Sequence, residues 1–186
     1  MFRIGSTRRA AAAALLAALA LVGCSKRGGP SDYERNQQAT KDDEQKRQDL
    51  AGSLKGQGAK LEKKRYPLGE GWAIDLRGVP VTDQLLADVS KLLYVSELNL
   101  SKTNVTDAHL AKMNDLELLK YCLKIDLSQT AVTDAGLDSL TKTLGGLGEL
   151  NLSGTKATPA AAERLKSRRQ ADPHVPKMFK NTKVTF

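Results

Sequence analysis

The sequence predicts an α/β fold in which a short strand and a return helix recur about four times along the chain. The first observation behind this prediction is a recurring triplet of an apolar, a polar and an apolar residue. A period of 20 to 29 residues is typical of repeats that consist of one strand and a return segment. The triplets begin at Ile74, Leu98, Ile125 and Leu150, which are 24, 27 and 25 residues apart.

The second observation is a threonine that follows the start of each triplet by eight residues and begins a helical pattern. Residues four and seven positions after each threonine are apolar, which places them on one face of a helix. The next residue is Asp in three units and Pro159 in the fourth, and both residue types favour the first helical turn. We therefore expect four helix N-caps, each stabilising by about 1 kcal/mol relative to Ala. They are Thr82, Thr106, Thr133 and Thr158.

Polar residues alternate with the apolar residues of each triplet. In a strand, alternate side chains point to opposite faces of the sheet. Stacked parallel strands would then carry two adjacent polar columns on a concave sheet. These columns supply the candidate partner-binding residues, which are Asp75, Arg77, Asn99, Ser101, Asp126, Ser128, Asn151 and Ser153.

Residues from about 70 to 160 resemble leucine-rich-repeat proteins, especially the ribonuclease-inhibitor-like and cysteine-containing types with a Thr-x-Val-Thr-Asp-x-x-Leu signature. The resemblance implies a right-handed α/β solenoid, with parallel strands on the concave face and helices on the convex face, that binds other macromolecules. It carries over no catalytic residues. Thr103, Thr130 and Thr155 stand where the family more often has Asn or Cys. We expect their hydroxyls to bond turn backbone between neighbouring units.

The start of the chain predicts export and lipid anchoring. Three arginines precede an apolar run over residues 10–22, which is typical of a signal peptide over residues 1–23. The run ends in Leu-Val-Gly-Cys, which resembles a bacterial lipobox and implies cleavage before Cys24, acylation of its new N-terminus and a membrane anchor. An ordinary secretory signal with an incidental cysteine is the alternative. We therefore expect a lipid-anchored protein of the bacterial cell envelope, and Ser25 favours the outer membrane if the cell has one.

The rest of the chain divides into a tether and one domain. Residues 24–42 are polar and charged, which predicts a disordered tether. The domain is expected over 43–186, with an N-terminal cap at 43–70, repeats at 71–165 and a basic C-terminal cap at 166–186. The N-terminal cap should contain a helix around Leu50 and Leu54 and a hairpin. Trp72 is expected to close the open end of the core, and the alternative is an aromatic residue that binds a partner.

Residues with catalytic or metal-binding potential are sparse in the sequence. Cys122 occupies an apolar position of its unit, which predicts a buried and unreactive thiol. The two histidines, His109 and His174, belong to no cluster with metal-ligand spacing. We therefore expect no enzyme activity and no cofactor. Nucleic-acid binding fits an exported chain poorly.

Two hypotheses of function follow from these patterns. The first is an interaction module that binds a protein partner through its concave sheet. The second is an envelope-associating or spacer protein, held by its acyl chains and a basic C-terminal region with affinity for an acidic envelope polymer. Residues 164–186 contain seven Lys or Arg and one acidic residue, Asp172. The full chain has a net charge of +8, which becomes +5 without the three arginines of the signal segment.

Overall fold

The computed structural model describes residues 32–66, 69–140, 144, 146–175, 177 and 181–186. Contacts divide the chain into residues 1–41 and 42–186, and the two units are treated separately below. The predicted signal segment and Cys24 lie outside the described residues.

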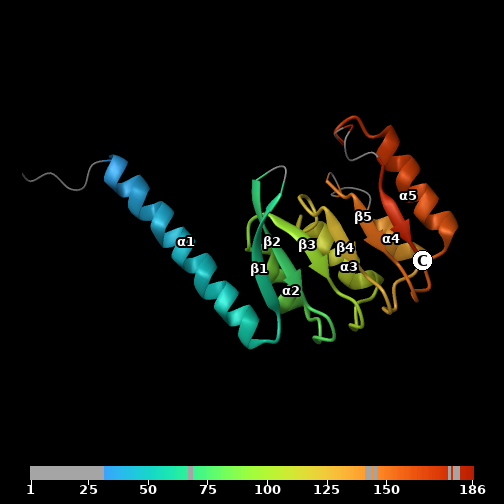
Figure 1. Ribbon diagram of the computed structural model, residues 1–186, viewed down its shortest axis with the longest axis horizontal. Helices are drawn as coiled ribbons and strands as arrows, with labels where there is room; N and C mark the ends of the chain where they lie inside the picture. Colours follow the sequence, from blue (N-terminus) through green and yellow to red (C-terminus); the bar gives the residue numbers. More distant parts are fainter. Residues whose placement is uncertain (1–31, 67–68, 141–143, 145, 176, 178–180) are drawn as a thin grey trace, which may run out of the picture. The chain divides into compact units, whose positions relative to one another are not determined.

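Helix α1 spans Asp32–Gly56 and differs from the predicted tether (Figure 1). We expected no regular structure over residues 24–42, but residues 32–42 are helical; residues 24–31 of that segment lie outside the described residues. The physical reason is local, since the chain has neither Gly nor Pro between Asp32 and Ala51 and is rich in good helix formers. Side-chain pairs one turn apart add support. These pairs are Lys46–Asp43 at 3.5 Å, Arg47–Glu44 at 3.3 Å and Gln45–Asp49 at 2.8 Å.

A six-stranded sheet forms the centre of the domain within the described residues, in the order β1 to β6 (Figure 1). β1 and β2 are the antiparallel hairpin expected in the N-terminal cap, and each later strand pairs in parallel with the one before it. The chain is therefore an α/β protein with a mostly parallel sheet. The strands are β1 Lys60–Tyr66, β2 Gly69–Asp75, β3 Val95–Asn99, β4 Lys124–Asp126, β5 Glu149–Asn151 and β6 Lys183–Thr185.

Four helices follow the strands, and α2, α3 and α4 lie on the same side of the sheet (Figure 1). They are α2 Asp83–Ser90, α3 Asp107–Asp115, α4 Asp134–Ser139 and α5 Pro159–Ala171. All four begin directly after the predicted threonine N-caps, which confirms that prediction. The predicted apolar helix face is buried as well, with Leu86, Leu110, Leu137 and Ala162 each at most 1% exposed.

Carboxylates at the helix starts join neighbouring units, which the sequence analysis did not foresee. Asp107 accepts hydrogen bonds from the backbone N–H of Thr133 at 2.8 Å and from its hydroxyl at 2.6 Å. Asp134 accepts the same two bonds from Thr158, at 2.6 and 2.8 Å. These bonds lower the pKa of Asp134, the backbone N–H of Thr158 having the largest effect. Each helix start is thereby tied to the next unit.

The first junction uses an amide instead of a carboxylate. Asn104 accepts a bond from the N–H of Val81 at 2.7 Å and donates one to its carbonyl at 3.0 Å.

The turn threonines act differently from the prediction. Their hydroxyls donate to the carbonyl three residues earlier in the same unit, so they close their own turns and do not bridge units. The bonds are Thr103–Leu100 at 2.6 Å, Thr130–Leu127 at 2.7 Å and Thr155–Leu152 at 2.7 Å.

The C-terminal cap packs against the rest of the domain, although its basic sequence suggests a solvent-exposed segment. α5 continues to Ala171, past the predicted boundary at residue 165, and carries the buried Arg169. The Arg169 guanidinium donates to the Leu147 carbonyl at 2.8 Å and to the Thr182 hydroxyl at 3.0 Å. This contact joins α5 to the segments before β5 and β6. The predicted last strand is present as β6, with Val184 packed against the core.

A glycine at the α3–α4 contact provides a test of the junction. A Cβ at Gly136 would collide with the Asp107 carboxylate and lie 3.0 Å from Leu110 Cδ1. We expect Gly136→Ala to lower the free energy of unfolding by about 1–3 kcal/mol because a well-packed contact must shift. Urea denaturation measures this change.

A matched control is Gly52→Ala in α1, where an added Cβ meets no atom within 4 Å. This change should stabilise by up to about 1 kcal/mol, since Ala is the better helix former. In the double variant Gly136→Ala with Asp107→Ala, the free energy of unfolding should fall by less than the sum of the decreases in the two single variants. Wild-type stability of the Gly136 variant would contradict the tight junction.

Candidate functional site

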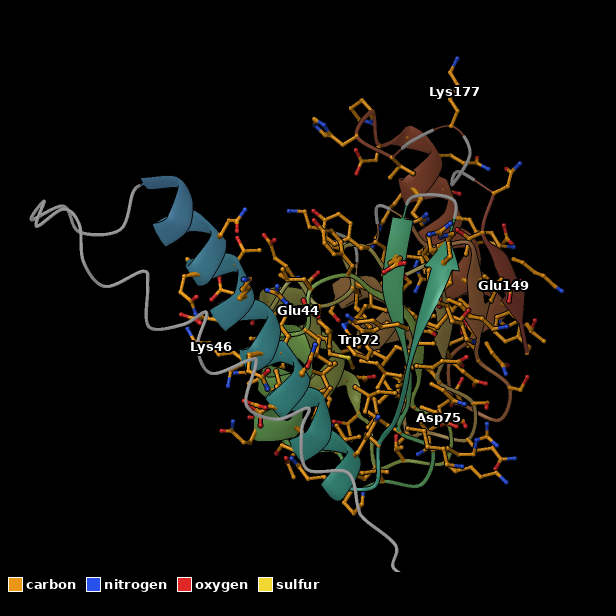
Figure 2. All side chains as sticks on the ribbon, turned by 60° about the vertical axis from the view of Figure 1, so that its left-hand side comes forward. Glu44, Lys46, Trp72, Asp75, Glu149 and Lys177 are labelled. Carbon is orange, nitrogen blue, oxygen red and sulfur yellow. The ribbon has the colours of Figure 1, made fainter. Side chains whose placement is uncertain are left out.

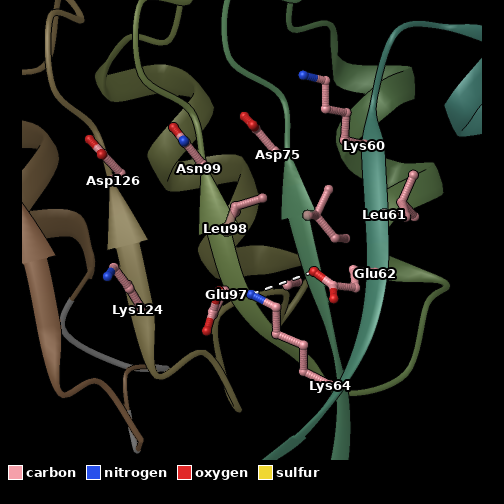
Figure 3. A pocket seen from close by; sticks show the side chains of 12 residues that line it. Lys60, Leu61, Glu62, Lys64, Asp75, Glu97, Leu98, Asn99, Lys124 and Asp126 are labelled. Carbon is pink, nitrogen blue, oxygen red and sulfur yellow. Dashed lines mark hydrogen bonds and ion pairs between the residues drawn. The ribbon is translucent and has the colours of Figure 1, made fainter.

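The strand face opposite the helices carries one of the two predicted columns. Asp75, Asn99, Asp126 and Asn151 occupy paired positions on β2 to β5, so they form one row across the sheet. Figure 3 shows the first three. All four are half-buried. We call them the acid–amide row.

Each member of this row also closes the turn after its strand. One side-chain oxygen accepts a hydrogen bond from the backbone N–H two residues on. The distances are 3.0 Å for Asp75–Arg77, 2.9 Å for Asn99–Ser101, 2.9 Å for Asp126–Ser128 and 3.1 Å for Asn151–Ser153. One polar atom of each side chain is therefore committed to the fold, and the others face outward.

The second predicted column does not lie on the sheet. Ser101 is buried, Ser128 and Ser153 are half-buried in turns, and Arg77 is exposed beyond the end of β2. The physical reason is that β4 and β5 end at the acid or amide, whose turn directs the next residues away from the sheet. Alternation continues only as long as the strand does.

A row of alternating charge takes the place of that second column. Glu97, Lys124, Glu149 and Lys183 are paired in register across β3 to β6. Glu97, Lys124 and Glu149 each precede a buried apolar residue, and Lys183 precedes the half-buried Val184. All four therefore point to the same face as the acid–amide row. We call these four residues the charged row. The signal was present in the sequence, because the residue before the second, third and fourth triplets reads Glu, Lys and Glu, whereas Ala73 precedes the first.

Charges in the charged row are partly compensated within the molecule. Lys124 Nζ lies 3.0 Å from Glu149, and Lys64 on β1 lies 3.2 Å from Glu97. The hydrogen bond and charge of Glu149 raise the pKa of Lys124, with a further contribution from Glu97. Exposed pairs of this kind contribute only about 0–1 kcal/mol to stability. Their main effect is a fixed pattern of alternating sign on the surface.

A shallow hollow of about 380 Å³ lies over the first strands of this face (Figure 3). Its walls come from β1 to β4 and include members of both rows, together with Lys60 and Lys64. The lining consists of four carboxylates, three lysines and the amide of Asn99, together with apolar strand residues. Such a surface can accept and donate several hydrogen bonds along an extended polypeptide.

Trp72 differs from its predicted role. It is half-buried and packs against the core, but it also lines a surface hollow with Glu44, Leu93 and Tyr94. Figure 2 labels Trp72 and Glu44. Lys63 Nζ lies 5.1 Å from its ring centroid. The ring is therefore not a full closure of the core, and the alternative of a binding aromatic residue stays open.

Three exposed apolar side chains escaped the sequence analysis. Leu93, Tyr94 and Tyr121 are 54%, 55% and 49% exposed. They precede β3 and β4 in loops, and the two tyrosine ring centroids lie 5.2 Å apart. The signal was weak, because Leu92-Leu93-Tyr94-Val95 reads as one apolar run with no indication of which members face out.

Cys122 is fully buried, as predicted, and is a free thiol. Its sulfur lies 3.3 Å from the Lys124 carbonyl oxygen. Burial raises the pKa of this thiol to about 12, and the charge of Glu97 acts in the same direction. Within the described part of the chain, no group of three or more His, Cys, Asp or Glu side chains is placed to hold a metal ion.

Comparison of the sequence with models of known protein families found no match, and comparison with curated proteins found none either. Among the helices that the structure describes, none is long and apolar enough to cross a membrane.

The buried thiol gives a test of the packing around β4. In a Cys24→Ser variant, a thiol reagent should label Cys122 rapidly in urea and hardly at all in native buffer. With a pKa of about 12, only about one thiol in a thousand is ionised at pH 9, and the thiolate is the reactive form.

Raising the pH toward 12 should increase native labelling, since deprotonation then becomes significant. A Cys122→Ala version serves as the blank. Equal labelling rates in native buffer and in urea would show that the thiol is accessible.

Proposed function

We propose that the chain is a lipid-anchored leucine-rich-repeat module of the bacterial cell envelope that binds a protein partner through its strand face. The fold in this proposal is a right-handed solenoid, with strands on the concave face and helices on the convex face. The observation that carries it is the pair of in-register rows, since one polar group per strand recurs at the same height across four strands.

The strand face has chemistry suited to a polypeptide. The acid–amide row offers hydrogen-bond acceptors and donors at one strand spacing, roughly 4.8 Å apart. Beside it, the charged row presents alternating signs at the same spacing. A partner segment with the opposite sequence of charges would fit, and one in the wrong register would meet like charges, which disfavour binding by several kcal/mol. The rows therefore favour specificity.

In this proposal the module is not an enzyme, uses no cofactor and binds no nucleic acid. The acid–amide row is hydrogen-bonded to backbone, and Glu97, Lys124 and Glu149 are ion-paired, which is typical of a rigid recognition surface. The eight predicted binding residues reduce to Asp75, Asn99, Asp126 and Asn151, and the charged row replaces the other four.

The alternative function rests on the basic C-terminal region, and the structure weakens its basis. Arg164 and Arg168 each lie 3.2 Å from an oxygen of Asp138, and Arg169 is buried. Lys166 lies 2.8 Å from Glu163. Fewer basic groups than the sequence suggests are thus available for an acidic polymer.

A charge-swap experiment separates the two functions. In the double variant Lys124→Glu with Glu149→Lys, the two central charges of the charged row are exchanged. The ion pair between them can form again, but the alternation of signs along the row is lost. We expect in-cell crosslinking and pull-down to recover the partner at least about tenfold less efficiently than with the wild type.

The matched control is Glu163→Lys with Lys166→Glu, which swaps an ion pair of 2.8 Å on α5, away from the strand face. This control should retain the partner. Equal recovery with both swaps would contradict binding through the strand face. If the pull-down instead recovers an acidic polymer, and this binding is abolished by high salt but unchanged by the strand-face swap, the function belongs to the basic region.

A further inference from the structure

An exposed apolar surface lies apart from the two rows, at the edge of the sheet where the parallel strands begin. It consists of Leu93, Tyr94 and Tyr121, with the half-buried Trp72 beside them, and we call it the aromatic edge. The backbone N–H of Trp72 donates to the Tyr94 carbonyl at 2.8 Å, which joins β2 to the loop before β3. The tyrosine rings contact each other at a tilt of 53°.

The fold holds these side chains outward. Leu92 and Val95, on either side of Leu93 and Tyr94, are 2% and 3% exposed, so the backbone cannot rotate without exposing them. Tyr94 has a φ of 61°, in the left-handed region that a bulky residue rarely adopts. Backbone strain at such a position persists only where the surroundings impose it. Exposure of the aromatic edge is therefore built into the structure.

Charges around the aromatic edge are largely compensated, since five basic groups face four carboxylates and Glu44 pairs with two of the five. Glu44 accepts from both Lys63 and Arg47, which lowers its pKa, Lys63 having the larger effect. The rim consequently has little net charge to attract or repel a charged surface. The pairs are Lys63–Glu44 at 3.0 Å, Arg47–Glu44 at 3.3 Å, Lys91–Asp88 at 2.7 Å, Lys120–Glu117 at 3.2 Å and Lys46–Asp43 at 3.5 Å.

We propose that the aromatic edge docks on the headgroup region of the membrane in which Cys24 is anchored. Tyr and Trp combine an apolar ring with a polar group and are enriched at membrane–water interfaces. A compensated rim can approach a bilayer without strong repulsion. The proposal rests on the lipid anchor of the proposed function.

The position of α1 in the sequence favours a membrane over a protein as the occupant. Residues Asp43, Arg47 and Leu50 of α1 line a hollow together with Leu93. Nineteen positions separate Cys24 from Asp43. Residues 32–43 are helical and rise about 1.5 Å each. The eight positions before them span at most about 3.6 Å each. Asp43, which borders the aromatic edge, therefore lies within about 45 Å of the anchor. Tethering over such a length gives an effective concentration in the millimolar range, at which a weak contact is occupied.

Trp72 and Cys24 allow a direct test. Trp72 is the single tryptophan of the sequence, so its emission reports on the aromatic edge alone. Cys122 is buried, which leaves Cys24 as the reactive thiol of the chain from residue 24 to 186. That chain is coupled through Cys24 to maleimide-headgroup lipid in phosphatidylcholine vesicles, with and without brominated acyl chains.

We expect a blue shift of Trp72 emission on coupling and quenching by the brominated lipid. The triple variant Leu93→Ser, Tyr94→Asn and Tyr121→Ser should lose both effects, while Phe186→Ser should keep them. Phe186 is a matched control because it is also 49% exposed and lies next to β6, at the other end of the sheet. Asn tolerates the left-handed backbone at position 94.

Replacing part of the neutral lipid by anionic phosphatidylglycerol, or adding salt, should change the quenching little because the rim is compensated. Identical emission of the coupled and uncoupled wild-type chains would overturn the proposal. So would quenching that requires anionic lipid and low salt, which would assign the contact to basic residues. A triple variant that loses a protein partner in pull-down but shows wild-type emission on vesicles would overturn it in favour of protein docking. Mass spectrometry of Cys24 from cells tests the anchor itself, independently of the chemical coupling.

Discussion

Backbone pairing between successive strands, with equivalent residues at the same height, is the constraint on which the rest of the structure depends. The N–H of Leu76, Leu100 and Leu127 each donates to the carbonyl of the acid or amide residue one strand further on, at 2.8–2.9 Å. This register stacks Ile74, Leu98, Ile125 and Leu150 in the core, all at most 2% exposed. The same register aligns the residues before and after them, whose side chains lie on the opposite face of the sheet. The two polar rows are thus a consequence of the same bonds that assemble the core.

Sequence reasoning reached the parts of the fold that repeat. The threonine N-caps, the buried helix face and the closing strand followed from residue type at fixed spacing, because every unit repeats the same local solution. The acid–amide row followed for the same reason. The prediction failed where a strand ended, since periodicity does not say that the turn after Asn99 or Asp126 removes the following serine from the sheet. Whether Arg169 of a basic run is buried depends on Leu147 and Thr182, which are distant in sequence.

Two further omissions have a common cause. The carboxylates of Asp107 and Asp134 were assigned to their own helix starts, where they do lie, yet their strongest contacts are with threonines 24 to 26 residues later. The aromatic edge was read as part of an apolar run. In both cases the residue type indicates what kind of contact the side chain can make. Which group it contacts, or whether it is exposed, depends on the neighbouring unit. Helix α1 shows the opposite case, in which local propensity prevails in a segment with few apolar residues.

The junction between units also limits how the array can lengthen. The unit that contains Thr133 and Asp134 has carboxylate contacts on both sides. Thr133 donates to Asp107 of the unit before it, and Asp134 accepts from Thr158 of the unit after it. The last unit accepts such a contact at Thr158 but has Pro159 where the others have aspartate. A second copy of the unit that contains Thr133 and Asp134, inserted before the last unit, would keep an aspartate–threonine hydrogen bond at each new junction. A copy added after α5 would have no aspartate at position 159 to accept a bond from its threonine. By this contact, further units can be inserted within the array but cannot be added after its last unit.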